Sequence, residues 1–150
     1  MLEQKIVDLL KEKNMKVSFA ESCTGGLLVA TLINASGASK ALDESYVTYS
    51  EEAKEKILGV KKSTLDKFTV YSKEVALEMA EGLKKITNAD FCVSVTGIAE
   101  SNEACKYHFA IITPSSKIVK EAFETGTRAT VRIKQTTNIL EELLAQISQF

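Results

Sequence analysis

The stretch Phe19-Ala20-Glu21-Ser22-Cys23-Thr24-Gly25-Gly26 decides how this chain is expected to fold. An apolar run over residues 17–20 stops at this small polar cluster, and a second apolar run over 27–33 follows the two glycines. The pattern predicts a strand over 17–20, a tight turn, and a helix over 24–34. Backbone N–H groups at a helix start attract negative charge, and glycines allow close approach. The turn could therefore present Ser22 as a nucleophile, although an N-cap role for Ser22 or Thr24 is the simpler alternative.

A second polar cluster follows the next predicted strand. Residues 46–49 are β-branched or aromatic and predict a strand, and residues 51–58 predict a short helix that carries Lys54 in its first turns. Ligands of α/β sheets bind beyond the carboxyl ends of parallel strands, so Ser22 and Lys54 would meet there if their strands are parallel neighbours. A desolvated lysine can act as the base for a serine. The alternatives are a surface Lys54 and a half-buried strand aromatic, Tyr49.

Two further clusters also follow predicted strands. Thr96 and Gly97 lie near the end of an apolar run over 90–98, and Arg128 stands just before the last predicted helix, with Arg132 one turn later. Arginines at a helix start can clamp a phosphate or a carboxylate. Both arginines could equally be ordinary helix-surface residues. The only histidine, His108, falls inside a predicted strand, which argues against a Ser-His-Asp triad.

The remaining pattern places these clusters in an α/β fold. Further helices are predicted over 2–13, 63–68, 73–86 and 130–147, and strands over 106–113 and 118–123 that form a hairpin. The last helix is expected to turn Ile133, Ile139, Leu140, Leu143, Leu144 and Ile147 inward. Alternation of strands and helices followed by a hairpin implies a mixed sheet with helices on both faces. No linker or repeat is visible, so residues 1–150 are predicted to form a single domain.

Composition limits the classes of function. The chain carries 19 basic and 20 acidic residues and a net charge of -1, so there is no general electrostatic case for nucleic-acid binding. No apolar stretch resembles a signal peptide or a membrane span. Three cysteines, Cys23, Cys92 and Cys105, match no zinc spacing and cannot all pair. We expect a cytoplasmic protein with no metal, no cofactor and no membrane partner.

These four clusters, in this order, resemble the C-terminal domain of the CinA family, which includes the nicotinamide-nucleotide amidases. The similar segments are AESCTGGLL at 20–28, VTYSEEAKEKILGV at 47–60, YSKEVALEMAEG at 71–82, TGIA at 96–99 and, more weakly, GTR at 126–128. The resemblance implies a three-layer α/β/α sandwich with a mixed, mostly parallel sheet, and a homodimer.

The family activity implied is hydrolysis of the carboxamide of nicotinamide mononucleotide to nicotinic acid mononucleotide and ammonia. By motif position Ser22 is the nucleophile, Lys54 its general base, and Tyr49 the tyrosine beside this dyad. The substrate-binding residues implied are Glu21, Cys23, Thr24, Gly25, Gly26, Thr96, Gly97, Arg128 and Arg132. Cys23 is a minor alternative candidate for the nucleophile, and its position next to Ser22 in the motif argues against it.

The chain also departs from the family pattern. Family members usually continue TGIAGP into a glycine-rich loop, whereas this chain has a shortened segment over 99–106 that contains Glu100 and Glu103. The acidic residue of the usual GDR is Thr127 here. Two interpretations follow, an amidohydrolase with an altered substrate wall and a non-catalytic nucleotide-binding or interaction module.

Overall fold

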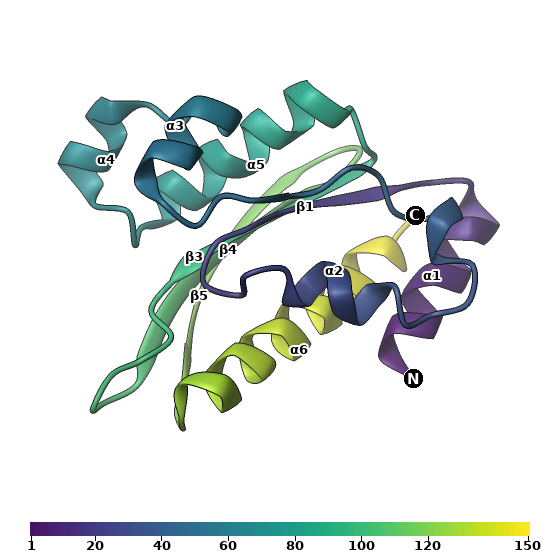
Figure 1. Cartoon of the computed structure of the whole chain (residues 1–150). Helices are drawn as coiled ribbons and strands as arrows, with labels where there is room; N and C mark the ends of the chain where they lie inside the picture. Colours follow the sequence, from purple (N-terminus) through teal and green to yellow (C-terminus); the bar gives the residue numbers. More distant parts are fainter.

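The computed structural model describes residues 1–150 as one five-stranded sheet with helices on both faces (Figure 1). The strands are β1 (Val17–Glu21), β2 (Tyr46–Val47), β3 (Phe91–Gly97), β4 (Cys105–Ile112) and β5 (Lys117–Glu124). The helices are α1 (Leu2–Lys13), α2 (Leu27–Leu32), α3 (Glu51–Leu58), α4 (Lys62–Phe68), α5 (Lys73–Thr87) and α6 (Arg128–Ile147), with a 3₁₀ turn at Ala38–Lys40.

The strand order β2-β1-β3-β4-β5 makes a mixed sheet. β1 pairs in parallel with both β2 and β3, whereas β3–β4 and β4–β5 are antiparallel. The carboxyl ends of β2, β1 and β3 therefore lie at the same end of the sheet. This places the segments that follow these strands next to one another, as the parallel-neighbour argument predicts.

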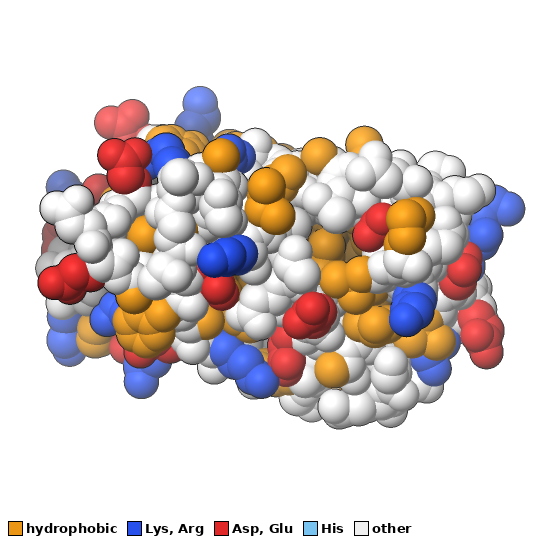
Figure 2. All heavy atoms as spheres, turned by 90° about the horizontal axis from the view of Figure 1, so that it is seen from below, with side chains coloured by type: hydrophobic (Ala, Val, Ile, Leu, Met, Phe, Trp, Pro, Cys, Tyr) orange, Lys and Arg blue, Asp and Glu red, His pale blue; other side chains and the backbone are white.

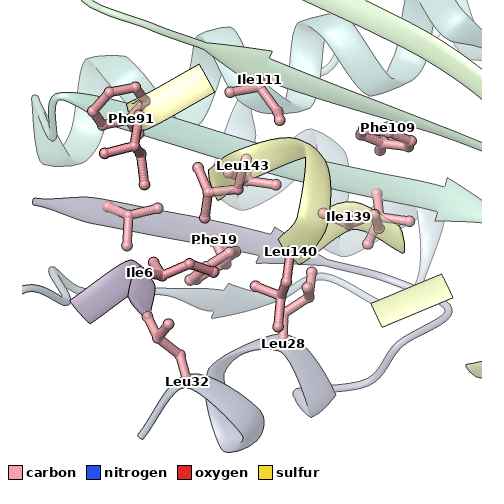
Figure 3. Close-up of a cluster of buried hydrophobic side chains, with 14 of the residues drawn as sticks. Ile6, Phe19, Leu28, Leu32, Phe91, Phe109, Ile111, Ile139, Leu140 and Leu143 are labelled. Atoms are coloured by element: carbon pink, nitrogen blue, oxygen red, sulfur yellow. The ribbon is translucent and has the colours of Figure 1, made fainter. Parts of the chain in front are cut away.

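Two apolar cores hold the three layers together. α1, α2 and α6 cover one face of the sheet over a cluster of 24 buried residues, and α3, α4 and α5 lie on the other side (Figure 1). Side chains of β1, β3 and β4 meet those of the helices in the first core, where Figure 3 labels Ile6, Phe19, Leu28, Leu32, Phe91, Phe109, Ile111, Ile139, Leu140 and Leu143. A second cluster of 13 buried residues packs mainly α5 against the opposite face. The architecture is the expected α/β/α sandwich.

The structure corrects three details of the sequence-based prediction. The helix expected over 24–34 is only Leu27–Leu32, because residues 23–26 form turns. The strand expected over 46–49 contains only Tyr46 and Val47. Ile133 is 57% exposed rather than buried, because it lies two residues, or about 200° of helical rotation, from buried Val131.

The surface carries both signs of charge. Acidic and basic side chains are interspersed with apolar ones on the face that α1, α2 and α6 form (Figure 2). No helix combines the length and the apolar character needed to cross a bilayer.

Candidate active site

The turn after β1 depends on two glycines. Gly25 and Gly26 have φ values of 61° and 104°, in the left-handed region that disfavours other residues. A Cβ at Gly25 would lie 3.1 Å from the guanidinium of Arg132, and Gly26 is the N-cap of α2. The two glycines are required by the backbone of the turn, and neither lines the pocket described below.

A buried carboxylate holds the start of α2. Glu21 is fully buried, and its oxygens accept hydrogen bonds from the Thr24 hydroxyl at 2.6 Å and from the backbone N–H groups of Gly26, Leu28 and Val29 at 3.2, 2.9 and 3.1 Å. The carboxylate satisfies the free N–H groups and the positive end of the helix. Glu21 and Thr24 were expected to bind substrate, but their side chains are buried and fully used inside the fold.

An arginine from the far end of the chain supports the same turn. The Arg132 guanidinium on α6 donates to the backbone oxygens of Cys23 at 3.0 Å and of Thr24 at 2.7 Å. The planar guanidinium can donate to both oxygens at once because its N–H groups point in fixed directions. Arg132 therefore positions the turn and does not reach the pocket, which differs from the substrate contact expected for it.

Ser22 and Lys54 lie in direct contact. Lys54 Nζ is 2.9 Å from Ser22 Oγ, 2.9 Å from the Thr48 oxygen and 3.3 Å from the Tyr49 oxygen. Lys54 is 1% exposed and Ser22 is 7% exposed. The lysine is held there because Ser50 caps α3 by accepting from the Ala53 N–H at 3.1 Å, which starts the helix directly after the Thr48–Tyr49 segment.

Burial changes the proton affinity of this lysine. Desolvation lowers the pKa of Lys54 to about 8, and the negative charge of Glu51 opposes the shift. A neutral amine has two N–H donors and one lone pair. Its hydrogens can bond to the Thr48 and Tyr49 oxygens while the lone pair accepts the Ser22 hydroxyl hydrogen, so the geometry suits a general base.

The backbone beside Ser22 offers free donors. The N–H groups of Cys23 and Thr24 bond to no oxygen of the chain, whereas those of Gly25 and Leu27 bond to the Ser22 and Thr24 oxygens. Of the two free groups, only that of Cys23 belongs to a residue that lines the pocket, because Thr24 is fully buried. Unused N–H groups directly after a nucleophile are suited to hold an oxyanion. The Cys23 thiol itself is buried, and desolvation raises its pKa to about 12, so it stays protonated and poorly nucleophilic.

A pocket of about 490 Å³ opens over the dyad. Of the predicted site residues, Ser22, Cys23, Tyr49, Lys54, Gly97 and Arg128 line it. The sequence-based site missed lining residues that come from α3, from the α4–α5 connection and from the segment after β3: Ser50, Glu51, Val70, Tyr71, Ile98, Ala99 and Glu100. Only Glu100 had a signal, as an acidic departure from the family loop. The volume of the pocket is typical of small-molecule sites.

Thr96 points away from this pocket. Successive side chains of a strand alternate between faces, and Thr96 shares the α5 side with Ser94, which bonds to the Ala76 oxygen. The Thr96 hydroxyl is fully buried and donates to the Val70 oxygen at 2.8 Å. Thr96 therefore fixes the wall of the pocket from behind rather than contacting a ligand.

The outer rim is exposed and charged. Arg128, the first residue of α6, donates from Nη2 to the Tyr49 hydroxyl at 3.0 Å, and its Nη1 lies 3.5 Å from a Glu100 carboxylate oxygen. Tyr49 is 61% exposed. Its backbone oxygen contacts the dyad, but its ring and hydroxyl belong to the rim.

Known proteins resemble this chain over almost its whole length. A family model described as the CinA C-terminal domain matches residues 1–147. A protein of Clostridioides difficile (strain 630) whose name describes it as competence-damage inducible is 40% identical over 154 residues, covering 99% of this chain and 37% of that protein. A CinA-like protein of Petrotoga mobilis is 52% identical over 98 residues, covering 65% of this chain and 24% of that protein. The chain thus spans well under half the length of these relatives.

Solved structures match over almost their full length. The competence damage-inducible protein A (ComA) of Klebsiella pneumoniae has a TM-score of 0.94 at 28% identity, covering 99% of this chain and 96% of that chain. The competence/damage inducible protein CihA of Agrobacterium tumefaciens has a TM-score of 0.90 at 33% identity, covering 97% and 93%.

Proposed function

This chain belongs to the CinA C-terminal domain family, and we propose that it is an amidohydrolase that uses Ser22 and Lys54 to hydrolyse a pyridine carboxamide. The single observation that carries the proposal is the 2.9 Å contact between Lys54 Nζ and Ser22 Oγ, made by a lysine that is 1% exposed. A serine next to a desolvated lysine is a known arrangement for an activated nucleophile. The substrate that the family resemblance implies is nicotinamide mononucleotide.

In the first half-reaction, neutral Lys54 takes the hydroxyl proton while Ser22 Oγ forms a bond to the carboxamide carbon. The carbonyl oxygen becomes an oxyanion, and the N–H group of the pocket-lining residue Cys23, which bonds to no oxygen of the chain, supports a role in holding it. When this intermediate collapses, the C–N bond breaks and the Lys54 ammonium gives its proton to the leaving nitrogen. Ammonia departs, and the acyl group remains as an ester on Ser22.

In the second half-reaction, water replaces ammonia. Lys54, neutral again, takes a proton from the water while the water oxygen bonds to the ester carbon, and the Cys23 N–H group again holds the oxyanion. Collapse breaks the bond to Ser22 Oγ, which recovers its proton from Lys54. The products are the carboxylic acid and the free enzyme.

A second candidate function is a non-catalytic binding module. The observation that favours it is the Glu100–Arg128 ion pair at the rim, which occupies the cation that a nucleotide phosphate would use. Because the chain spans 37% of the length of the Clostridioides difficile relative, activities of longer family members enter here only as proposals.

The test is ammonia release from nicotinamide mononucleotide and a panel of amides. The amidase proposal expects release by the natural sequence, loss in Ser22→Ala, and normal release in Ser63→Ala, an exposed serine on α4. Binding of the nucleotide without release of ammonia from any amide would favour the binding module.

A further inference from the structure

The charges that line the pocket are unbalanced when the proposed base is ready to act. Four lining residues are of types that carry a charge near neutral pH: Glu51, Lys54, Glu100 and Arg128. Lys54 must be neutral to accept the serine proton, and it then contributes no charge. One positive and two negative groups remain, which sum to a formal charge of -1 (+1 - 1 - 1).

The one positive group at the rim already has partners within the chain. Arg128 Nη1 lies 3.5 Å from Glu100, and Arg128 Nη2 donates to the Tyr49 hydroxyl at 3.0 Å. Figure 1 shows why these residues meet, because the β3–β4 connection and the start of α6 lie at the same end of the molecule. A phosphate placed on Arg128 would lie beside the Glu100 carboxylate.

We propose that Glu100 is a specificity-determining residue that disfavours phosphate-bearing substrates and selects cationic carboxamides without a phosphate, such as a pyridinium nucleoside. This inference rests on the proposed amidohydrolase function. A pyridinium nucleoside carries one positive charge and complements the pocket, whereas addition of a phosphate makes the ligand anionic and repels it. The preference comes from Coulombic repulsion between the ligand phosphate and the Glu100 carboxylate. It does not come from the strength of the exposed Glu100–Arg128 ion pair, which is small.

The structure separates Glu100 from the other acidic residue of the same segment. Glu100 lines the pocket, whereas Glu103 is exposed, lies outside the lining and forms no ion pair. Both residues belong to the segment over 99–106 that departs from the family pattern. Glu103 therefore offers a matched control, with the same charge change in the same loop.

The experiment compares two ligands that differ only in the phosphate, nicotinamide mononucleotide and nicotinamide riboside. Dissociation constants are measured by calorimetry on Ser22→Ala, alone and combined with Glu100→Gln or Glu103→Gln, at low and high salt. Ammonia release by the active protein is measured in parallel. We expect the riboside to bind more tightly, and Glu100→Gln to shift the ratio of the two dissociation constants about tenfold toward the phosphate-bearing ligand at low salt. The shift should shrink at high salt, and Glu103→Gln should leave the ratio unchanged.

The outcomes distinguish this inference from the proposed function. Tighter binding of the mononucleotide, an unmoved ratio in Glu100→Gln, or no binding of either ligand would overturn the specificity role of Glu100. Binding with the expected ratio but no ammonia from either amide would support the charge assignment and reject the hydrolase.

Discussion

The two sides of the pocket differ in how tightly the fold determines them. On the inner side, Ser22 and Lys54 line the pocket and Glu21 lies behind the turn, and the buried polar groups of all three bond to partners within the chain. On the outer side, Glu100 and Arg128 have side chains that are 73% and 50% exposed and meet at 3.5 Å. The inner side also keeps the family motif, whereas the outer side carries the departures from it.

This difference indicates where chemistry and selectivity reside in the molecule. A buried polar network tolerates little change, because a lost partner leaves a desolvated group unsatisfied. An exposed rim can change its charge at little cost in stability. We therefore expect changes on the inner side to affect turnover and folding, and changes on the outer side to affect the choice of ligand.

The largest effect is expected from removing the dyad. Ser22→Ala and Lys54→Met should each lower ammonia release by about a thousandfold or more, and the double variant should be little worse than either one, because the two side chains act as a unit. Steady-state ammonia release measures this, with Lys56→Met on the exposed side of α3 as the control. Independent, additive losses would show that the two residues do not share one step.

The second largest effect is expected when Glu21 is changed, and it concerns the free energy of unfolding. Glu21→Gln places an amide nitrogen among three backbone N–H donors and removes the negative charge at the start of α2, so we expect the free energy of unfolding to fall by about 3 kcal/mol. Urea unfolding followed by circular dichroism measures it. Glu52→Gln, an exposed carboxylate on α3, should change stability by less than about 0.5 kcal/mol. Equal effects of the two changes would remove the structural role assigned to Glu21.

Burial of Lys54 also predicts a pH-dependent stability. The folded pKa is about 8, below the value of 10.5 for a free lysine. Between these pH values the unfolded chain binds more protons than the folded chain, so the free energy of unfolding should rise with pH. Relative to Lys54→Met, the natural protein should gain up to about 3 kcal/mol from pH 8 to 10.5. A difference between the two proteins that does not vary with pH would mean that Lys54 is not desolvated.

The smallest effect is expected on the outer side. Arg128→Ala removes an exposed cation, so we expect the free energy of unfolding to change by less than about 0.5 kcal/mol. Affinity for nicotinamide mononucleotide should fall about fivefold, less than for a free rim cation, because Glu100 already offsets its charge. Calorimetry measures the affinity, and urea unfolding measures the free energy of unfolding. A loss of stability comparable to that of Glu21→Gln would place Arg128 in the folded framework.

Local pattern predicted the α/β class, and it brought Ser22 and Lys54 together on the condition that their strands are parallel neighbours. Ser22 directly follows β1, Lys54 lies on the helix after β2, and the parallel pairing of these strands meets the condition. The alternation of β3 could also have shown that Thr96 faces α5, because Val93 and Val95 alternate with it and lie in the core on the other face of the sheet.

Other features depend on contacts that no local pattern contains. Glu21 was expected to bind substrate because the family resemblance implied it, and only the path of α2 shows that its carboxylate is used as a cap. Arg132 reaches the turn across 109 positions of sequence, from Arg132 to the Cys23 oxygen. The contact between Glu100 and Arg128 depends on how the β3–β4 connection lies against the start of α6, which is distant in the sequence.

The most direct test of the account is an NMR titration of the Lys54 side chain in the natural protein. The central claim is that burial beside Ser22 lowers the pKa of this amine to about 8, so that a neutral fraction is available to act as the base. We predict a titration midpoint near 8, with ammonia release rising through the same midpoint to a plateau at higher pH. A midpoint close to the ordinary 10.5 of lysine would contradict the claim, because a charged ammonium cannot take the serine proton.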